Sequence, residues 1–463
     1  AMLPVIGIVV LFAIAQAQER LVFVSAIFRH GLRAPERTLN GLQYDKEAFP
    51  YGLGELTEAG IRRSHDLGRF LANRYVDNVF LSQNVDNREF YIQSVDNNRC
   101  LMSAQALAQG MFSPSSRVVP MPIPVHTRPL HSDWMLAFPW DKCDALGREF
   151  ARYCNFPDIR SLNSLKLYQS TLFECMGAKG SFFNDTQTFA MADSLIAHEL
   201  AGSPLPAWYT PYLRMEARAI VAKALRFQLG LGEYFNPTII RLTTGQLFDT
   251  ILKEILHKWN CQMHRDDPNC FAIQPLKFKA VSADDSVLIS LLETIGARRE
   301  ALAKALTPQN SAVLIFELWN VQGQAMIKVL YKRGPHSSKL VNLSGNTRNC
   351  KGVIACPLER FAACCDEFRT SSPMEECLVK PVFPTPGPLP ALGLPPLPTE
   401  APVAEAQSLP PPPSAFNAAP NAFNTPVLDP ERNPGFPPIG NGIDVRRWLN
   451  VRSLRQDQGR SRV

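Results

Sequence analysis

Apolar and polar positions follow two kinds of pattern along the chain, short continuous apolar runs and longer helical repeats. The runs LVFVSAI at 21–27 and FYIQSV at 90–95 each lead into polar residues. Runs of this length, rich in branched and aromatic residues, are typical of buried strands. Two later runs, SAVLIFELWN at 311–320 and AMIKVLYKRG at 325–334, predict a neighbouring pair of strands.

Several segments between these runs carry apolar residues three and four positions apart, which predicts amphipathic helices. The first of them opens with Thr57, a residue type that caps helix N-termini. The predicted helices cover residues 56–75, 98–111, 217–232, 243–259 and 286–306. Because strands alternate with helices, we expect an α/β fold with a mostly parallel central sheet flanked by helices. Ligands of such sheets bind at the carboxyl ends of the strands.

The two ends of the chain depart from this globular pattern. Residues 1–17 hold an apolar run that ends in Ala-Gln-Ala, as in a signal peptide with its cleavage site, although an uncleaved anchor is the alternative. No other segment has the roughly 20 apolar residues of a membrane-spanning helix, so we expect no stable membrane span after cleavage. Residues 381–463 are rich in proline and predict a disordered tail with a basic C-terminus.

Composition narrows the class of protein. The chain has 463 residues, of which 46% are hydrophobic, enough for a large core. The formal net charge of +6 is modest, and the Lys and Arg residues of the globular part are dispersed, which argues against a nucleic-acid partner.

The cysteines and the export signal together predict disulfide bonds. There are 11 cysteines, so at least one thiol is left unpaired. Cys261 and Cys270 are close enough in sequence to close a local loop, and a zinc site around them is the weaker alternative. Cys364 and Cys365 are adjacent, and we do not expect them to pair with each other.

Two asparagines lie in glycosylation sequences. Asn184 stands in NDT and Asn342 in NLS. These sequences carry weight because the chain is expected to be exported, so we predict glycosylation at both positions.

The sequence FRHGLRAP directly follows the first predicted strand and concentrates positive charge. It places Arg29 and Arg33 around His30 and Gly31. Guanidinium groups match phosphate oxygens in a bidentate way, so this cluster suits an anion. We interpret Gly31 as a small residue that lets a ligand approach closely.

This stretch resembles the R-H-G-x-R-x-P signature of the histidine acid phosphatases. Four further segments resemble the same family, in particular its prostatic and lysosomal members: FPYGLGELTEAGIRRSHDLGRFLANRY, SVDNNRCLMSAQALAQGMF, VHTRPLHSDWML and ACPLERFAACC. The resemblance implies a phosphoglycerate mutase-like fold over residues 20–380, with a smaller, mainly helical cap formed by insertions around 130–240. It also implies a homodimer.

The resemblance implies a role for each residue of the cationic cluster. His30 would be the nucleophile that forms a phosphohistidine. The guanidinium groups of Arg29, Arg33 and Arg99 would bind the phosphate oxygens. No metal and no organic cofactor would be required.

The segment VSADDSVL contains the expected proton donor and a departure from the family. The family sequence at this point reads S-A-H-D, so Asp285 aligns with the proton donor and Asp284 stands where a phosphate-binding histidine belongs. Loss of one such donor costs about 10² to 10³ in rate. An ionised Asp284 would add a repulsion of about 4 kcal/mol at 4 Å from a phosphate charge.

Two orientations of Asp284 are open at this stage. If it faces the pocket, we expect it to hold its proton beside another acid and a phosphate, which gives a more acidic pH optimum. If it turns away, it only caps the helix that begins near Ser286.

The family resemblance also implies two disulfides. These are Cys143–Cys377 and Cys350–Cys356, whereas a third family bridge is missing because Ala312 replaces a cysteine. Proximity in sequence suggests a further pair of Cys154 with Cys175.

The sequence therefore predicts a secreted or lysosomal acid phosphatase that hydrolyses small-molecule or peptide phosphomonoesters. The main alternative is an impaired or inactive homologue that binds phospho-ligands, because of Asp284. A third hypothesis makes the proline-rich tail the functional part. A phosphoglycerate mutase-like role is disfavoured by the export signal and the cysteines.

Overall fold

The structure is a computed structural model, and it describes residues 19–36, 46, 49–112, 122–154, 175–178 and 180–378. The predicted signal peptide at 1–17 and the predicted tail at 381–463 lie outside the described residues. Among the described residues, no helix has both the length and the apolar character needed to cross a membrane.

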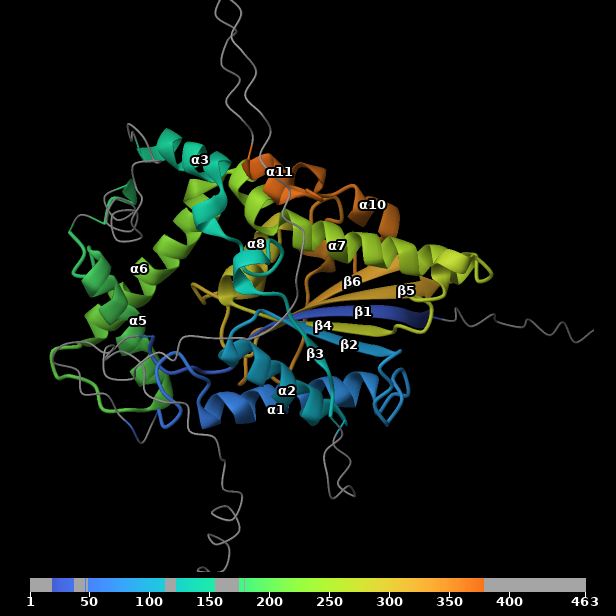
Figure 1. Cartoon of the computed structure of the whole chain (residues 1–463), viewed down its shortest axis with the longest axis horizontal. Coiled ribbons are helices and arrows are strands. Elements are labelled where there is room, and N and C mark those ends of the chain that lie inside the picture. Colours follow the sequence, from blue (N-terminus) through green and yellow to red (C-terminus); the bar gives the residue numbers. More distant parts are fainter. Residues whose placement is uncertain are drawn as a thin grey trace, which may run out of the picture. The chain divides into compact units, whose positions relative to one another are not determined.

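The core of the fold is an eight-stranded sheet (Figure 1). The strand order is β3-β2-β4-β1-β5-β6-β7, and β8 pairs with β6. The strands are β1 (Glu19–Arg29), β2 (Phe90–Ser94), β3 (Val125–His126), β4 (Phe278–Ala283), β5 (Val313–Val321), β6 (Gln324–Lys332), β7 (Val341–Asn342) and β8 (Cys356–Pro357).

Most strands of this sheet run in one direction. β1 pairs in parallel with β4, β4 with β2, and β2 with β3. β5 is antiparallel to both β1 and β6, so β6 runs in the direction of β1, and only β5, β7 and β8 run against it. The mostly parallel α/β sheet and the late strand pair are thus confirmed.

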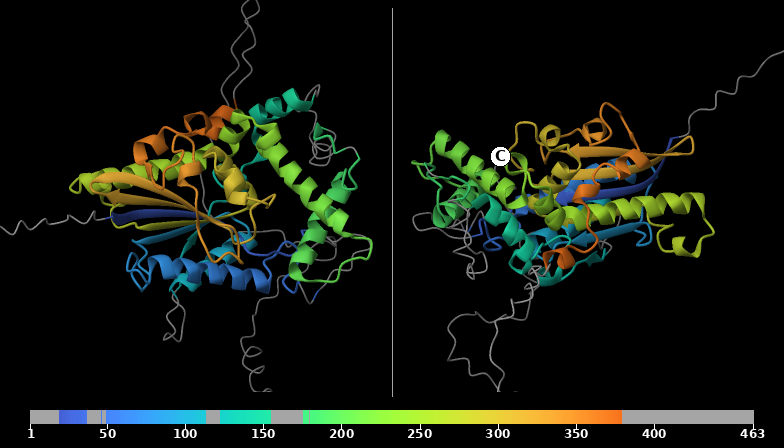
Figure 2. Two further views of the ribbon diagram at one scale, coloured as in Figure 1. Left: turned by 180° about the vertical axis from the view of Figure 1, so that it is seen from behind. Right: turned by 90° about the horizontal axis from the view of Figure 1, so that it is seen from above.

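Helices cover both faces of the sheet. They are α1 (Glu58–Tyr75), α2 (Asn98–Phe112), α3 (Asp144–Cys154), α5 (Thr186–Ala201), α6 (Pro211–Leu229), α7 (Pro237–Met263), α8 (Asp285–Thr294), α9 (Arg298–Leu302), α10 (Leu358–Ala362) and α11 (Pro373–Cys377). α1 and α2 lie on one face and α7 on the other, while α3, α5 and α6 lie beyond the carboxyl end of β1 (Figures 1 and 2).

The burial of β1 explains how the sheet holds both layers together. Successive side chains of a strand point to opposite faces. Accordingly, Val24 and Phe28 belong to the core shared with α1 and α2, whereas Phe23 and Ile27 belong to the core shared with α7 and α8. A strand that is apolar on both faces has to be central, which is why its carboxyl end lies in the middle of the sheet edge.

The helix predicted over 286–306 is wrong as one continuous element. α8 ends at Thr294 and α9 begins at Arg298. Between them, Gly296 has a φ of 81°, in the left-handed region that ends helices and that glycine adopts without strain. The short strand β4, which ends directly before the two aspartates, is not among the strands predicted from the sequence.

Disulfides close several parts of the described chain. Both bridges implied by the family resemblance are present, as is the local one suggested by sequence proximity: Cys143–Cys377, Cys350–Cys356 and Cys261–Cys270. The suggested pair of Cys154 with Cys175 involves a side chain outside the described residues.

The expectation that Cys364 and Cys365 do not pair is wrong. They form a disulfide, with their Cα atoms 3.7 Å apart. The two residues lie in the turn that follows α10, where the backbone is free of the regular geometry that makes neighbouring side chains diverge. Within the described part of the chain, the unpaired thiol is the buried Cys100.

Candidate active site

Three neighbouring strands deliver the predicted site residues to one edge of the sheet. β1 ends at Arg29, and the backbone N–H of His30 donates to the carbonyl of Ala283 at the end of β4, at 3.1 Å. Arg99 lies in the first turn of α2, just after β2, and Asp285 begins α8, just after β4. The site is therefore at the carboxyl ends of parallel strands, where ligands of such sheets bind.

The imidazole of His30 is held in one orientation. It is only 1% exposed, and its Nδ1 lies 2.7 Å from the carbonyl oxygen of Gly31. A carbonyl oxygen can only accept, so Nδ1 carries a hydrogen and donates it. The second nitrogen, Nε2, is left to face the charged groups of the site.

Asp284 faces the site and contacts this second nitrogen. Its Oδ1 lies 3.2 Å from His30 Nε2 and accepts a hydrogen bond from Arg99 Nε at 3.1 Å. Asn97 Nδ2 lies 3.5 Å from the other carboxylate oxygen. Asp284 stands at the N-cap position of α8, but its side chain makes no capping hydrogen bond. The interpretation that Asp284 turns away to cap this helix is therefore wrong.

The contact between Asp284 and His30 requires a proton. With Nδ1 donating to Gly31, a neutral ring would direct the lone pair of Nε2 at the carboxylate. The pKa of His30 is lowered from its ordinary value of 6.5, because burial and the charges of Arg29 and Arg99 outweigh the hydrogen bond and the charge of Asp284. Burial raises the pKa of Asp284, but the hydrogen bond with His30 and the charge of Arg99 outweigh it and hold the pKa of Asp284 well below its usual range.

The geometry places the shared proton on His30 and the negative charge on Asp284, because a bare Nε2 would repel the carboxylate oxygen 3.2 Å away and Arg99 also stabilises the carboxylate. The sequence-based expectation of a protonated Asp284 considered only a second acid and a phosphate as its neighbours. The structure adds an imidazole and a guanidinium, which favour the ionised form.

Asp285 points to a different partner from its neighbour. Its Oδ2 lies 2.9 Å from Arg29 Nη2, and Nη1 of the same arginine donates to the carbonyl of Pro308 at 2.6 Å. The two adjacent aspartates thus diverge, one toward His30 and one toward Arg29.

Arg33 is paired with a residue that sequence reasoning missed. Its Nη2 donates to Asp193 Oδ1 on α5 at 2.8 Å. The carboxylate oxygen Oε1 of Glu36 lies 3.7 Å from Arg33 Nη2 and 3.8 Å from Arg99 Nη1. No local signal singles out Asp193, because it lies 160 positions from Arg33 in an ordinary helical stretch. Each of the three predicted arginines is thus paired with a carboxylate of this chain.

Gly31 is required for packing. A Cβ atom built on Gly31 would lie 2.4 Å from the carbonyl oxygen of Gly60 in α1, closer than real Cβ atoms come to other atoms. This differs from the interpretation that the glycine leaves room for a ligand, because the space beside it is filled by the backbone of the helix.

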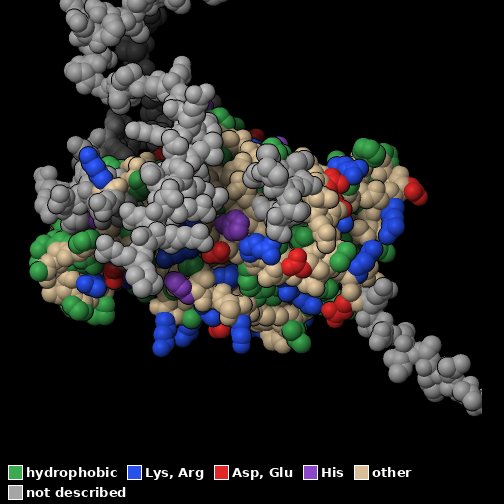
Figure 3. Space-filling model, turned by 90° about the horizontal axis from the view of Figure 1, so that it is seen from below, with side chains coloured by type: hydrophobic (Ala, Val, Ile, Leu, Met, Phe, Trp, Pro, Cys, Tyr) green, Lys and Arg blue, Asp and Glu red, His purple; other side chains and the backbone are tan. Residues whose placement is uncertain are grey.

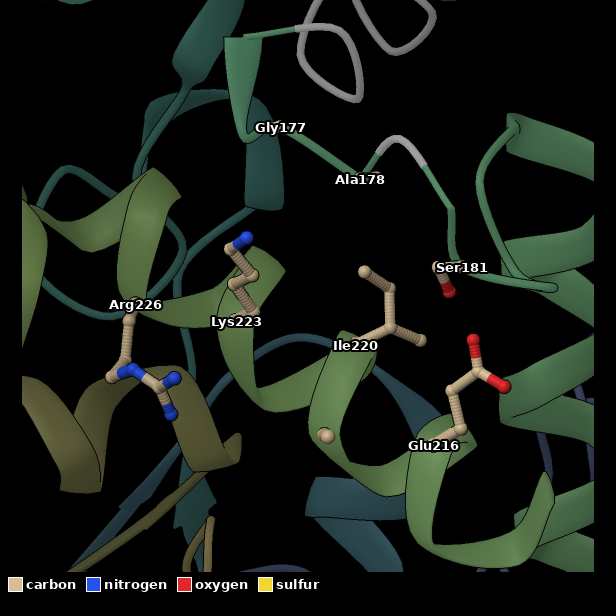
Figure 4. A pocket seen from close by; sticks show the side chains of 8 residues that line it. Gly177, Ala178, Ser181, Glu216, Ile220, Lys223 and Arg226 are labelled. Carbon is tan, nitrogen blue, oxygen red and sulfur yellow. The ribbon is translucent and has the colours of Figure 1, made fainter. Parts of the chain in front are cut away.

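A separate cavity of about 280 Å³ lies against α6 (Figure 4). Glu216, Lys223 and Arg226 line it, opposite Gly177 and Ala178. It contains none of the predicted site residues. On the face covered by α1 and α2, Lys and Arg side chains are interspersed with Asp and Glu (Figure 3).

Comparison with protein families relates this chain to phosphatases. The family model of the histidine phosphatase superfamily (branch 2) matches residues 20–332. "Putative acid phosphatase 1" of Caenorhabditis elegans is 29% identical over 374 residues, which cover 80% of this chain and 85% of that protein. "Testicular acid phosphatase" of Homo sapiens is 32% identical over 372 residues, which cover 74% of this chain and 78% of that protein.

Solved structures support the fold alone. A phytase from Citrobacter braakii has a TM-score of 0.52 at 15% identity and covers 78% of this chain and 100% of its own. Hafnia alvei phytase in complex with tartrate has a TM-score of 0.51 at 15% identity and covers 77% of this chain and 98% of its own.

The substitution Gly31→Ala tests whether this glycine is needed for packing against α1 or for the approach of a ligand. Because the added methyl group would meet the Gly60 backbone, we expect the free energy of unfolding to fall by about 1–3 kcal/mol in urea denaturation. An unchanged unfolding free energy, together with weakened phosphate binding, would instead show that Gly31 serves ligand approach.

Proposed function

Because the chain belongs to the histidine phosphatase superfamily and is a phosphoric monoester hydrolase, we propose that it is an acid phosphatase that forms a phosphohistidine on His30. The observation that carries this proposal is the orientation of His30. Its Nδ1 is engaged by Gly31, so Nε2 is the nitrogen available to phosphorus.

In the first step, Nε2 attacks phosphorus in line while the bond to the leaving group breaks. The guanidinium groups of Arg29, Arg33 and Arg99 exchange their carboxylate partners for phosphate oxygens and stabilise the transferred group. Such an exchange is favourable because a phosphate offers more charge and more acceptor atoms than one carboxylate.

Once Arg29 has exchanged Asp285 for a phosphate oxygen, the Asp285 carboxylate takes up a proton from the solvent and supplies it to the departing alkoxide. An alkoxide is a poor leaving group, so general-acid catalysis contributes about 10² to 10⁴ in rate. In the second step water attacks the phosphohistidine, the N–P bond breaks, and Asp285 accepts a proton from that water. His30 is regenerated and inorganic phosphate is released, without a cofactor.

A specific observation favours one alternative, a homologue that binds phospho-ligands without turnover. The carboxylate of Asp284 contacts the nitrogen that has to attack phosphorus. If a substrate did not displace Asp284, the arginine cluster would bind anions and His30 would remain inert.

We further propose that the enzyme is secreted or lysosomal, with 1–17 as signal peptide and 20–380 as the catalytic domain with a helical cap around 130–240. The names "Prostatic acid phosphatase" and "Lysosomal acid phosphatase" of two relatives support this location. Asn184 and Asn342, the proposed glycosylation sites, are both exposed. We also propose that the enzyme is a homodimer and that its tail at 381–463 is a spacer.

Hydrolysis of a generic aryl phosphate by the purified protein at pH 4 to 6 tests the proposed activity. We expect turnover in the wild type and none above background in His30→Ala, because the variant lacks the nucleophile. Equal rates in the two proteins would exclude phosphohistidine chemistry, and binding of phosphate without turnover would support the alternative.

The role of Asp285 is tested by the dependence of the rate on the leaving group. We expect Asp285→Asn to lower kcat by about 10² to 10⁴ for alkyl phosphates, whose leaving groups need a proton. The loss should be much smaller for nitrophenyl phosphates, which leave as stable anions. An equal loss for both substrates would assign Asp285 a role other than proton donation.

A further inference from the structure

The contact between Asp284 and His30 is not used by the reaction proposed so far. One carboxylate oxygen touches both the nucleophilic nitrogen and a phosphate-binding arginine. A phosphoryl group bound for attack has to occupy the same space beside Nε2. Phosphate and the Asp284 oxygen therefore compete for one position.

The proton in this contact is an obstacle to catalysis. A protonated Nε2 has no lone pair and cannot attack phosphorus. His30 is almost fully buried, whereas the Asp284 side chain is 27% exposed and lies 3.2 Å away. Asp284 is thus the group best placed to receive this proton.

We propose that Asp284 accepts the proton of His30 Nε2 when a phosphomonoester enters and then donates it in a hydrogen bond to a phosphate oxygen. The N–H bond of the imidazolium breaks and an O–H bond forms on Asp284. The freed electron pair of Nε2 then forms the N–P bond. This inference rests on the proposed phosphatase function.

The phosphate itself drives this transfer. Before phosphate enters, Arg99 and the imidazolium stabilise the negative charge of Asp284. Once a phosphate replaces Asp284 as the partner of Arg99, an ionised Asp284 carboxylate beside the phosphate is unfavourable. A proton on Asp284 then forms a short, strong hydrogen bond to a phosphate oxygen. The neutral acid then supplies the donor that the family's histidine would supply at this position.

Several charged groups set the balance of this pair. Positive charge comes from Arg29 at the end of β1, Arg33 in the segment that follows and Arg99 on α2. Glu36 and Asp285 contribute negative charge. The Cys100 thiol on α2 stays protonated, because burial raises its pKa. Within the pair Arg29–Asp285, and within the pair Arg33–Asp193, the positive and negative charges largely cancel. The proton therefore moves between His30 and Asp284.

A distinctive pH dependence follows. In the wild type, the resting pair has a protonated His30 and an ionised Asp284, and the reactive pair has a neutral His30 and a protonated Asp284. Both pairs hold the same number of protons, so lowering the pH does not reduce the share of the reactive pair. In Asp284→Asn, the amide can still donate to phosphate, but His30 has to lose its proton to water. The activity of the variant should therefore fall about tenfold per pH unit below the pKa of His30.

The test is the ratio of kcat/KM in the wild type to that in Asp284→Asn, measured with one aryl phosphate. The ratio removes the contributions of Asp285 and of substrate ionisation, which both proteins share. We expect it to fall as the pH rises from 4 to 7, by about tenfold per pH unit below the pKa that His30 has in the variant. A ratio that is constant with pH would contradict the inference and leave Asp284 a structural role.

Controls keep the outcome decisive. Asp86→Asn removes a carboxylate that is 28% exposed and pairs with Arg88 away from the site, and it should give a pH-independent ratio near one. If Asp284→Asn does not fold, Asp284→Ser also keeps a donor and cannot take the proton. Absence of wild-type turnover above His30→Ala would contradict the proposed function, whereas turnover with parallel profiles would contradict only this inference.

Discussion

The parallel pairing of β1 with β4 is the constraint on which the site depends. Its register places Arg29 opposite Ala283, so the residues that follow each strand leave the sheet side by side. The hydrogen bond from the His30 N–H to the Ala283 carbonyl extends this pairing by one residue. A shift of one position would turn the side chains of β4 to the opposite face and separate Asp284 from His30.

The electrostatic state of the site follows from this arrangement. Three guanidinium groups that suit a phosphate are each paired with a carboxylate of the same chain. The charges are therefore compensated without a ligand, and in the proposed reaction the binding of phosphate is an exchange of partners. Asp284 is the exceptional member of the set, because it also contacts Nε2 of His30 and, in our proposal, receives the proton of that nitrogen.

The sequence predicts those parts of the site that are local in the chain. Arg29 and Arg33 flank His30 directly after a strand that is apolar on both faces, so their place at the sheet edge could be inferred from pattern alone. Tertiary contacts could not be inferred: Asp193 reaches Arg33 from α5. The orientation of Asp284 was equally open, because an N-cap residue can direct its side chain to the helix or away from it.

The protonation state of His30 is the central claim, and it can be observed directly. In the protein without phosphate or substrate at pH 6, 15N NMR of histidine-labelled protein reports whether each ring nitrogen carries hydrogen. The signal of His30 among the 8 histidines is assigned by its loss in His30→Gln. We predict that both ring nitrogens carry hydrogen in the wild type and that Nε2 loses its hydrogen in Asp284→Asn. A neutral wild-type ring with a bare Nε2 would contradict the account.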